Sequence, residues 1–145
     1  DFVPLDEDRV KEVVYWPKDS SQEWLGCDAA HLQQLQRLSP GRRCFVVLDG
    51  NQTVGVVDIE ESGDGAAWMS LFVRPDARGK GMGQSILRSL LSDEAISHIH
   101  ELKVEIENNN PASLRCFEGA GFVRREEPGT TEGFAFLSAK IGATR

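Results

Sequence analysis

Apolar and polar positions in the middle of the chain predict three consecutive strands. Cys44–Leu48 is an apolar run, and Asp49-Gly50-Asn51 after it has the residues of a tight hairpin turn. The returning strand spans Thr53–Glu60, and a second turn at Ser62–Gly65 leads into a strand over Ala66–Val73. Because both turns are short, the three strands should form an antiparallel meander.

A helix and a half-buried strand come next. The helix begins near Gly81, and its apolar residues share one face: Met82, Ile86, Leu87, Leu90 and Leu91. Residues 102–107 then alternate between apolar and charged, which is the period of a strand with one buried face.

A short helix and two strands close the chain. Asn110 is a good N-cap, and Pro111 suits the first helical position. The helix spans Ala112–Glu118, a strand opens at Phe122-Val123, and a last strand covers Gly133–Ile141.

The N-terminal part reads as a strand remnant followed by two helical segments. Asp1–Leu5 leans apolar, and the acids from Asp6 onward favour a helix start, which Pro17 later interrupts. A second helix is predicted from Asp28 to Leu38. The element order is therefore β-α-α-β-β-β-α-β-α-β-β. We expect an α/β chain with a mixed, mostly antiparallel sheet, in a single domain over residues 1–145.

Composition and charge remove several function classes. The net charge of −7 leaves no basic face for nucleic acid, and no apolar run is long enough to span a membrane. The cysteines are few, widely spaced and without a Cys-x-x-Cys pair, so we expect a cytoplasmic protein without disulfides. His98 and His100 lack a third ligand at metal spacing, so no metal site is expected.

The turn between the third meander strand and the next helix has the features of a pyrophosphate site. Glycines at 79, 81 and 83 let backbone N–H groups approach a ligand closely. The helix start leaves its first N–H groups unpaired and carries partial positive charge. Arg78 and Lys80 add two full charges. Together these features predict the binding of a phosphorylated cofactor.

Two common phosphate motifs do not fit this turn. A P-loop needs Ser or Thr after Gly-Lys, where this chain has Gly81, and a dinucleotide fingerprint needs a third glycine that is missing. Arg78, Gly81 and Gly83 instead resemble the Gln/Arg-x-x-Gly-x-Gly/Ala pattern of the GNAT acetyltransferase superfamily. Asn110-Pro111-Ala112, followed downstream by Gly121-Phe122, resembles that family's second signature.

This resemblance implies a fold with splayed fourth and fifth strands that hold acetyl-CoA between them. By the resemblance, the strand end would pair with the pantetheine arm, the turn would hold the pyrophosphate, and Asn110 and Phe117 would lie near the arm and the sulfur. The residues implied in cofactor binding are Leu71, Phe72, Val73, Arg78, Gly79, Lys80, Gly81, Met82, Gly83, Gln84, Asn110 and Phe117.

The chemistry implied is direct acetyl transfer to a primary amine in a ternary complex, which needs a base. Glu105 lies in a Val-Glu-Ile run that resembles ribosomal-protein alanine N-acetyltransferases, whose glutamate has this role. The alternative is a solvated strand carboxylate. A second family position for the glutamate is Ala67 here, so that route is closed. Phe117 stands where many members have Tyr, and a phenyl ring cannot donate a proton to the departing sulfur.

The acceptor and the partners stay open at this point. The likeness around Glu105 favours a protein N-terminus, whereas Cys116–Phe122 weakly resembles aminoglycoside 6'-N-acetyltransferases and favours a small polycation. Three tryptophans are candidates for lining the acceptor pocket, and packing in the core or a contact with a homodimer partner is the alternative: Trp16, Trp24 and Trp68. The competing function is a non-catalytic acyl-CoA-binding module that has lost its acid at Phe117.

Overall fold

A computed structural model describes residues 2–4, 40–74, 79, 81–126 and 130–141 of the chain. The predicted N-terminal helices, and with them Tyr15, Trp16, Trp24 and Cys27, lie outside the described residues, as do Arg78 and Lys80 of the predicted phosphate turn.

The described residues form seven strands, two α-helices and one 3-10 turn. The strands are β1 (Phe2–Pro4), β2 (Arg42–Asp49), β3 (Gln52–Glu61), β4 (Ala66–Val73), β5 (Glu101–Glu107), β6 (Val123–Arg125) and β7 (Phe134–Lys140). The helices are α4 (Met82–Leu91), η2 (Glu94–Ile96) and α5 (Pro111–Gly119). Each predicted strand and helix within this part of the chain is found, and η2 is an element that the sequence pattern did not indicate.

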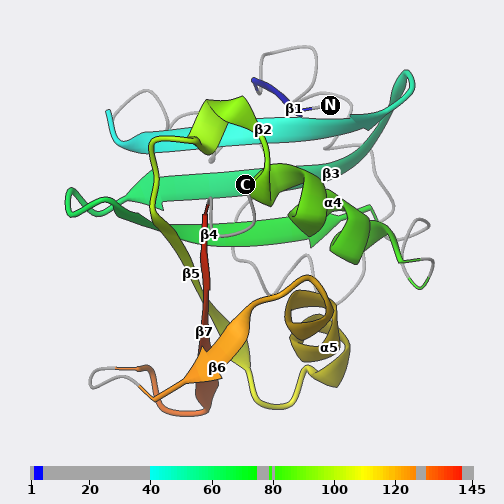
Figure 1. Cartoon of the computed structure of the whole chain (residues 1–145). Coiled ribbons are helices and arrows are strands. Elements are labelled where there is room, and N and C mark those ends of the chain that lie inside the picture. Colours follow the sequence, from blue (N-terminus) through cyan, green and yellow to red (C-terminus); the bar gives the residue numbers. More distant parts are fainter. Residues whose placement is uncertain (1, 5–39, 75–78, 80, 127–129, 142–145) are drawn as a thin grey trace. The chain divides into compact units, whose positions relative to one another are not determined.

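The strands are hydrogen-bonded in the order β1-β2-β3-β4-β5-β7-β6 (Figure 1). The β4–β5 pair is parallel, whereas β1–β2, β2–β3, β5–β7 and β6–β7 are antiparallel. The prediction of a mixed, mostly antiparallel sheet with helices is confirmed. The chain divides into two compact units, Asp1–Glu60 with Ser70–Lys80, and Glu61–Met69 with Gly81–Arg145.

The first unit contains the β1–β2–β3 ladder and the end of β4. Cys44, Val46 and Val56 form its buried cluster, and Phe72 of β4 packs against it. At the start of β2, the Arg42 guanidinium donates from Nε and Nη2 to the two carboxylate oxygens of Asp58, at 3.0 and 2.7 Å. This two-point contact closes the β2–β3 ladder at the end away from its hairpin turn.

The second unit is built on β5, which pairs with β7 over its whole length. Seven Cα pairs run from Glu101–Lys140 to Glu107–Phe134. Leu102, Val104 and Ile106 are buried, and the charged residues between them are partly exposed. This is the predicted alternation, and it puts every odd-numbered residue of β5 on one face of the sheet.

Helix α5 begins as its sequence predicts. The Oδ1 atom of Asn110 accepts a hydrogen bond from the backbone N–H of Ser113 at 3.2 Å, and Pro111 occupies the first turn, where its missing N–H costs nothing. The helix ends at Gly119, and Gly121 beyond it has a φ of 105° that favours glycine.

Replacing the cap should weaken the fold measurably. Asn110→Ala leaves the Ser113 N–H without its acceptor, and we expect a loss of about 1 kcal/mol in the free energy of unfolding. Asn110→Ser keeps a capping oxygen and should retain most of the stability. Urea unfolding of the three proteins measures the difference, and equal midpoints for the alanine and serine variants would contradict the capping role.

Candidate functional site

The backbone that leaves β4 is fixed at the point where the predicted phosphate turn begins. The N–H of Arg74 donates to the carbonyl of Val54 at 2.8 Å, and its guanidinium Nη1 donates to the carbonyl of Thr53 at 3.1 Å. Residues 75–78 and 80 lie outside the described part, so the turn itself is seen at Gly79 and Gly81.

Gly79 and Gly81 both have a φ of 76°, in the left-handed region. Gly81 is the N-cap of α4, and no side chain caps the helix. The first helical hydrogen bond runs from the N–H of Ser85 to the carbonyl of Gly81 at 3.1 Å. The N–H groups of the three residues before Ser85 therefore precede the helical ladder, and the first turn has no acidic residue to repel an anion.

The side chain of Gln84 turns towards α5. Its Oε1 accepts a hydrogen bond from Nη2 of Arg88 at 3.2 Å, and the same Arg88 atom donates to the carbonyl of Gly119 at 3.1 Å. A Cβ on Gly119 would collide with the Gln84 amide, so the glycine leaves room for the Gln84 side chain in this position. With its side chain engaged here, Gln84 offers an anion its backbone N–H.

The residues predicted to pair with the pantetheine arm are the last three residues of β4. Leu71, Phe72 and Val73 are all partly exposed. Cα pairs between β4 and β5 run from Ala66–Glu101 to Trp68–Lys103 in the described residues, and both strands continue beyond them, to Val73 and Glu107.

Glu105 lies on the partly exposed face of β5, opposite to its buried neighbours. Its Oε1 accepts a hydrogen bond from the backbone N–H of Thr131 at 3.3 Å. Phe136 is its partner in the β5–β7 register. The carboxylate is thus held by one donor from the segment before β7, and its second oxygen accepts no hydrogen bond from the described residues. Thr131 could not be identified from the sequence, because its contact with Glu105 depends on the β5–β7 register.

Lys103 lies two residues before Glu105 on the same face of β5, and it belongs to a group with two aromatic residues, Trp68 and Phe136. The rings of Trp68 and Phe136 meet edge to face, with centroids 5.6 Å apart and planes at 71°. The ammonium of Lys103 lies 5.6 Å from the centroid of the Trp68 ring, within the range of a cation–π contact. Trp68 is 39% exposed although it is a large aromatic residue.

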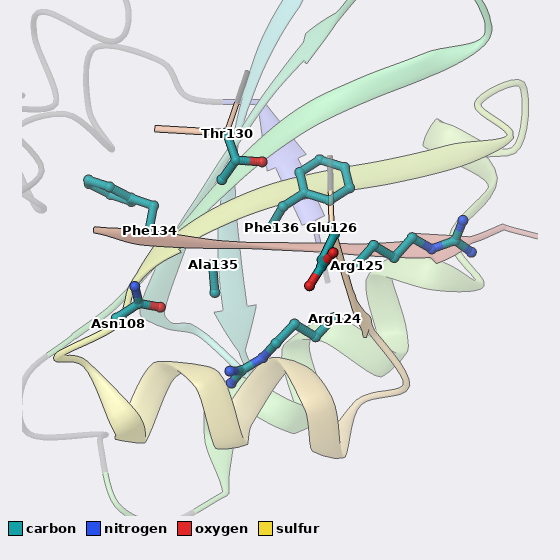
Figure 2. A pocket seen from close by; sticks show the side chains of 8 residues that line it. All are labelled: Asn108, Arg124, Arg125, Glu126, Thr130, Phe134, Ala135 and Phe136. Carbon is teal, nitrogen blue, oxygen red and sulfur yellow. The ribbon is translucent and has the colours of Figure 1, made fainter. Parts of the chain in front are cut away.

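A pocket of about 520 Å³ lies beside this group in the second unit. Figure 2 shows Asn108, Ala135 and Arg124 on the α5 side of β7, with Phe136 and Thr130 on the other side. Its described lining is Asn108, Arg124, Arg125, Glu126, Thr130, Phe134, Ala135 and Phe136. Nη2 of Arg124 also donates to Glu118 at 3.2 Å. These lining residues were not singled out from the sequence, since they come together only through the β6–β7 pairing.

Phe117 and Ala67 are buried. Phe117 is 4% exposed, and its ring meets Phe122 edge to face with centroids 5.0 Å apart. Ala67 has no exposed surface and faces the core of the second unit. Neither position offers an ionisable group. Asn110, predicted to contact the cofactor, uses its Oδ1 for the α5 cap and keeps its amide NH₂ as a donor.

The histidines do not form a metal site within the described chain. Nε2 of His98 lies 3.0 Å from Oε1 of Glu61, and no group of three or more His, Cys, Asp or Glu residues there is arranged to hold a metal ion. No helix of the described chain is long and apolar enough to cross a membrane.

Along the chain, the site so far consists of a strand, a glycine turn, an uncapped helix start and a capped second helix. Comparison with protein-family models gives a match to the description "Acetyltransferase (GNAT) family" over residues 9–122, well over half of the chain. The chain belongs to the GNAT acetyltransferase family.

Two curated relatives are named as an N-acetyltransferase and an N-acyltransferase, and a solved structure has the same fold. The GNAT chain is 35% identical over 93 residues to the uncharacterized N-acetyltransferase YfmK of Bacillus subtilis, covering 64% of this chain and 62% of YfmK. It is 37% identical over 54 residues to the L-amino acid N-acyltransferase MnaT of Escherichia coli, covering 37% and 31%. The matches thus span less than two thirds of these relatives' own lengths. The structure of AAC(6')-Ib with acetyl-CoA shares the fold, with a TM-score of 0.76 at 18% identity, over 96% of this chain and 92% of that one.

Cys116, on the same turn of α5 as Phe117, is a poor nucleophile. Burial raises the pKa of its thiol above the ordinary value, so the thiolate fraction at neutral pH is smaller than for a free cysteine. This disfavours an acetyl-enzyme formed on Cys116.

Alkylation tests this directly. In the folded protein at pH 8, iodoacetamide should modify Cys116 more slowly than in the urea-unfolded protein, and the rate should rise with pH as thiolate forms. Peptide mass spectrometry separates this thiol from the other two cysteines. Equal alkylation rates in the folded and the unfolded protein would contradict the inference that burial protects the Cys116 thiol and keeps it protonated.

Proposed function

We propose that this GNAT chain transfers an acetyl group directly from acetyl-CoA to a primary amine, on a small molecule or a protein N-terminus. The observation that carries the proposal is the uncapped start of α4, with left-handed glycines at 79 and 81 directly before it. Such a helix start binds anions through backbone N–H groups and the helix dipole. In a GNAT chain the anion is the pyrophosphate of acetyl-CoA.

The proposed cofactor contacts are those that the family resemblance implies. Backbone N–H groups of Met82, Gly83 and Gln84 bind the pyrophosphate, and Arg78 and Lys80 add charge from the turn. The edge of Leu71–Val73 pairs with the pantetheine arm as an added strand. The Asn110 amide donates to the arm, and the acetyl end reaches towards α5, where Phe117 is situated.

Glu105 acts as the general base, directly or through one water. It removes a proton from the acceptor ammonium, and the freed amine attacks the thioester carbonyl carbon. The nitrogen of the tetrahedral intermediate then loses its second proton to water, the carbonyl re-forms as the C–S bond breaks, and CoA leaves as the thiolate. Phe117 cannot supply a proton to the sulfur, but a thiol is acidic enough for its thiolate to depart.

Gly81→Ala should weaken acetyl-CoA binding. A Cβ at Gly81 would meet nothing within 4 Å, so the cost is confined to the backbone, which must leave a φ of 76° and shift the N–H groups. We expect the Kd for acetyl-CoA, measured by calorimetry, to rise about tenfold.

Gly63→Ala is the matched control. Gly63 has a φ of 83°, also has open space at its Cβ, and lies in the turn before β4. The Gly63→Ala variant should lose about as much stability as Gly81→Ala and keep the wild-type affinity for acetyl-CoA. A Gly81 variant that binds acetyl-CoA as tightly as the Gly63 variant would count against the cofactor site.

Glu105→Gln should lower kcat for amine acetylation by about 10²–10⁴-fold and leave the Kd for acetyl-CoA unchanged, because the amide keeps the shape and loses the basicity. Glu107→Gln, on the same strand face, is the control and should retain turnover. Thiol release across a panel of amines is the measurement. Unchanged turnover excludes Glu105 as the base. Acetyl-CoA binding without thiol release from any amine favours the non-catalytic module.

A further inference from the structure

Lys103 is the cationic side chain on the face of β5 that carries Glu105. It pairs with Trp68 in the β4–β5 register, at the last Cα pair between these strands. Its ammonium lies over the Trp68 ring at 5.6 Å, and no carboxylate of the described chain lies within ion-pair distance of it. The residue is partly exposed, so this charge faces the same space as Glu105.

One acidic group that feels this charge, Asp64, is already engaged elsewhere. The Asp64 carboxylate accepts from Oγ of Ser62 at 2.6 Å and from the N–H of Ala66 at 3.0 Å. The pKa of Asp64 is lowered chiefly by Ser62, then by Ala66, and least by Lys103. Lys103 thus acts on Asp64 at a distance and is not neutralised by it.

The spacing of Lys103 and Glu105 fits a ligand with opposite charges on one carbon. Residues two apart on a strand share a face and have Cα atoms roughly 6.6 Å apart. An α-amino acid has its ammonium and carboxylate on a single carbon, so its carboxylate can meet Lys103 while its ammonium meets Glu105. The pair is complementary in sign and order to such a ligand.

We propose that Lys103 binds the carboxylate of an α-amino-acid acceptor and so directs its α-amine to Glu105. The inference rests on the proposed acetyl transfer and adds the acceptor class. Trp68 contributes in two ways, since its ring holds the Lys103 ammonium in place and its exposed part offers apolar surface to the acceptor side chain. A polycationic acceptor would instead place a second positive charge against Lys103, which is unfavourable.

The test compares each L-amino acid with its α-amide, which keeps the amine and the side chain and removes the negative charge. For the amino acid, kcat/KM of the wild-type protein should be about 10–100-fold higher than kcat/KM of Lys103→Met, because the variant loses the charge-assisted contact. Because the amide's amine is more easily deprotonated, the acid-to-amide ratio is compared between variants. Lys103→Arg should keep most of the wild-type ratio.

Lys140→Met is the control. Lys140 faces the same side of the sheet, pairs with Glu101, and is exposed at the far end of the ladder, so its loss should leave the acid-to-amide ratio unchanged. Thermal unfolding of each variant checks that the fold is retained. If Lys103→Met acetylates amides and acids in the wild-type ratio, the inference about Lys103 is wrong while the proposed function stands.

Ligand binding tests Lys103 without turnover. If no amine releases thiol, the proposed acetyl transfer fails, and calorimetry then compares N-acetyl-L-leucine with N-acetyl-L-leucinamide on the protein loaded with CoA. Tighter binding of the acid, lost in Lys103→Met and kept in Lys140→Met, supports the carboxylate site. Equal binding of acid and amide by the wild-type protein overturns it.

Discussion

The pairing of β5 with β7 determines which residues of this chain can do chemistry. Seven consecutive Cα pairs fix the register of β5, and its apolar residues must face the core. Because side chains alternate, a slip by one residue would bury Lys103 and Glu105 and expose Leu102 and Val104. The burial of three apolar side chains therefore holds the charged face in place, and that free energy exceeds what any one polar contact on the face supplies.

The second constraint is at the start of α4, where the glycines of the turn determine how the helix begins. Left-handed glycines on either side of residue 80 let the chain turn into the helix without a side-chain cap. The unpaired N–H groups that result would be a cost in an isolated helix. In the proposed complex the pyrophosphate of acetyl-CoA would accept hydrogen bonds from these N–H groups, in place of the Ser, Thr, Asp or Asn that usually begins a helix. Further along, Arg88 ties the same helix to the carbonyl of Gly119.

Much of this was predictable because it is local. The Ala66–Val73 strand, the alternation after Glu101 and the Asn110 cap each depend on residues a few positions apart, and all three are found as expected. The two family signatures, Arg78–Gly83 and the one that begins at Asn110, indicated the GNAT fold because each is itself a short run of sequence.

The contacts around Glu105 could not be predicted in the same way. Thr131 donates to Glu105, and Phe136 meets Trp68, only because β7 lies between β5 and β6. Nothing in the local sequence states that order. The 3-10 turn η2 was missed because three residues carry no periodicity, although Asp93 caps it through the N–H of Ala95 at 2.9 Å.

The departure from the family pattern at Phe117 has a packing reason that bears on the chemistry. The ring is buried edge to face against Phe122, whose N–H also donates to the Phe117 carbonyl at 3.0 Å. A tyrosine hydroxyl there would need a polar partner, and burying one without a partner costs about 1–3 kcal/mol. The chain thus has a tightly packed α5–β6 junction in place of a proton donor. Amine attack needs a base far more than thiolate departure needs an acid, since an ammonium is not nucleophilic at all. A junction without a phenol is therefore compatible with transfer, provided that a carboxylate such as Glu105 receives the amine's proton.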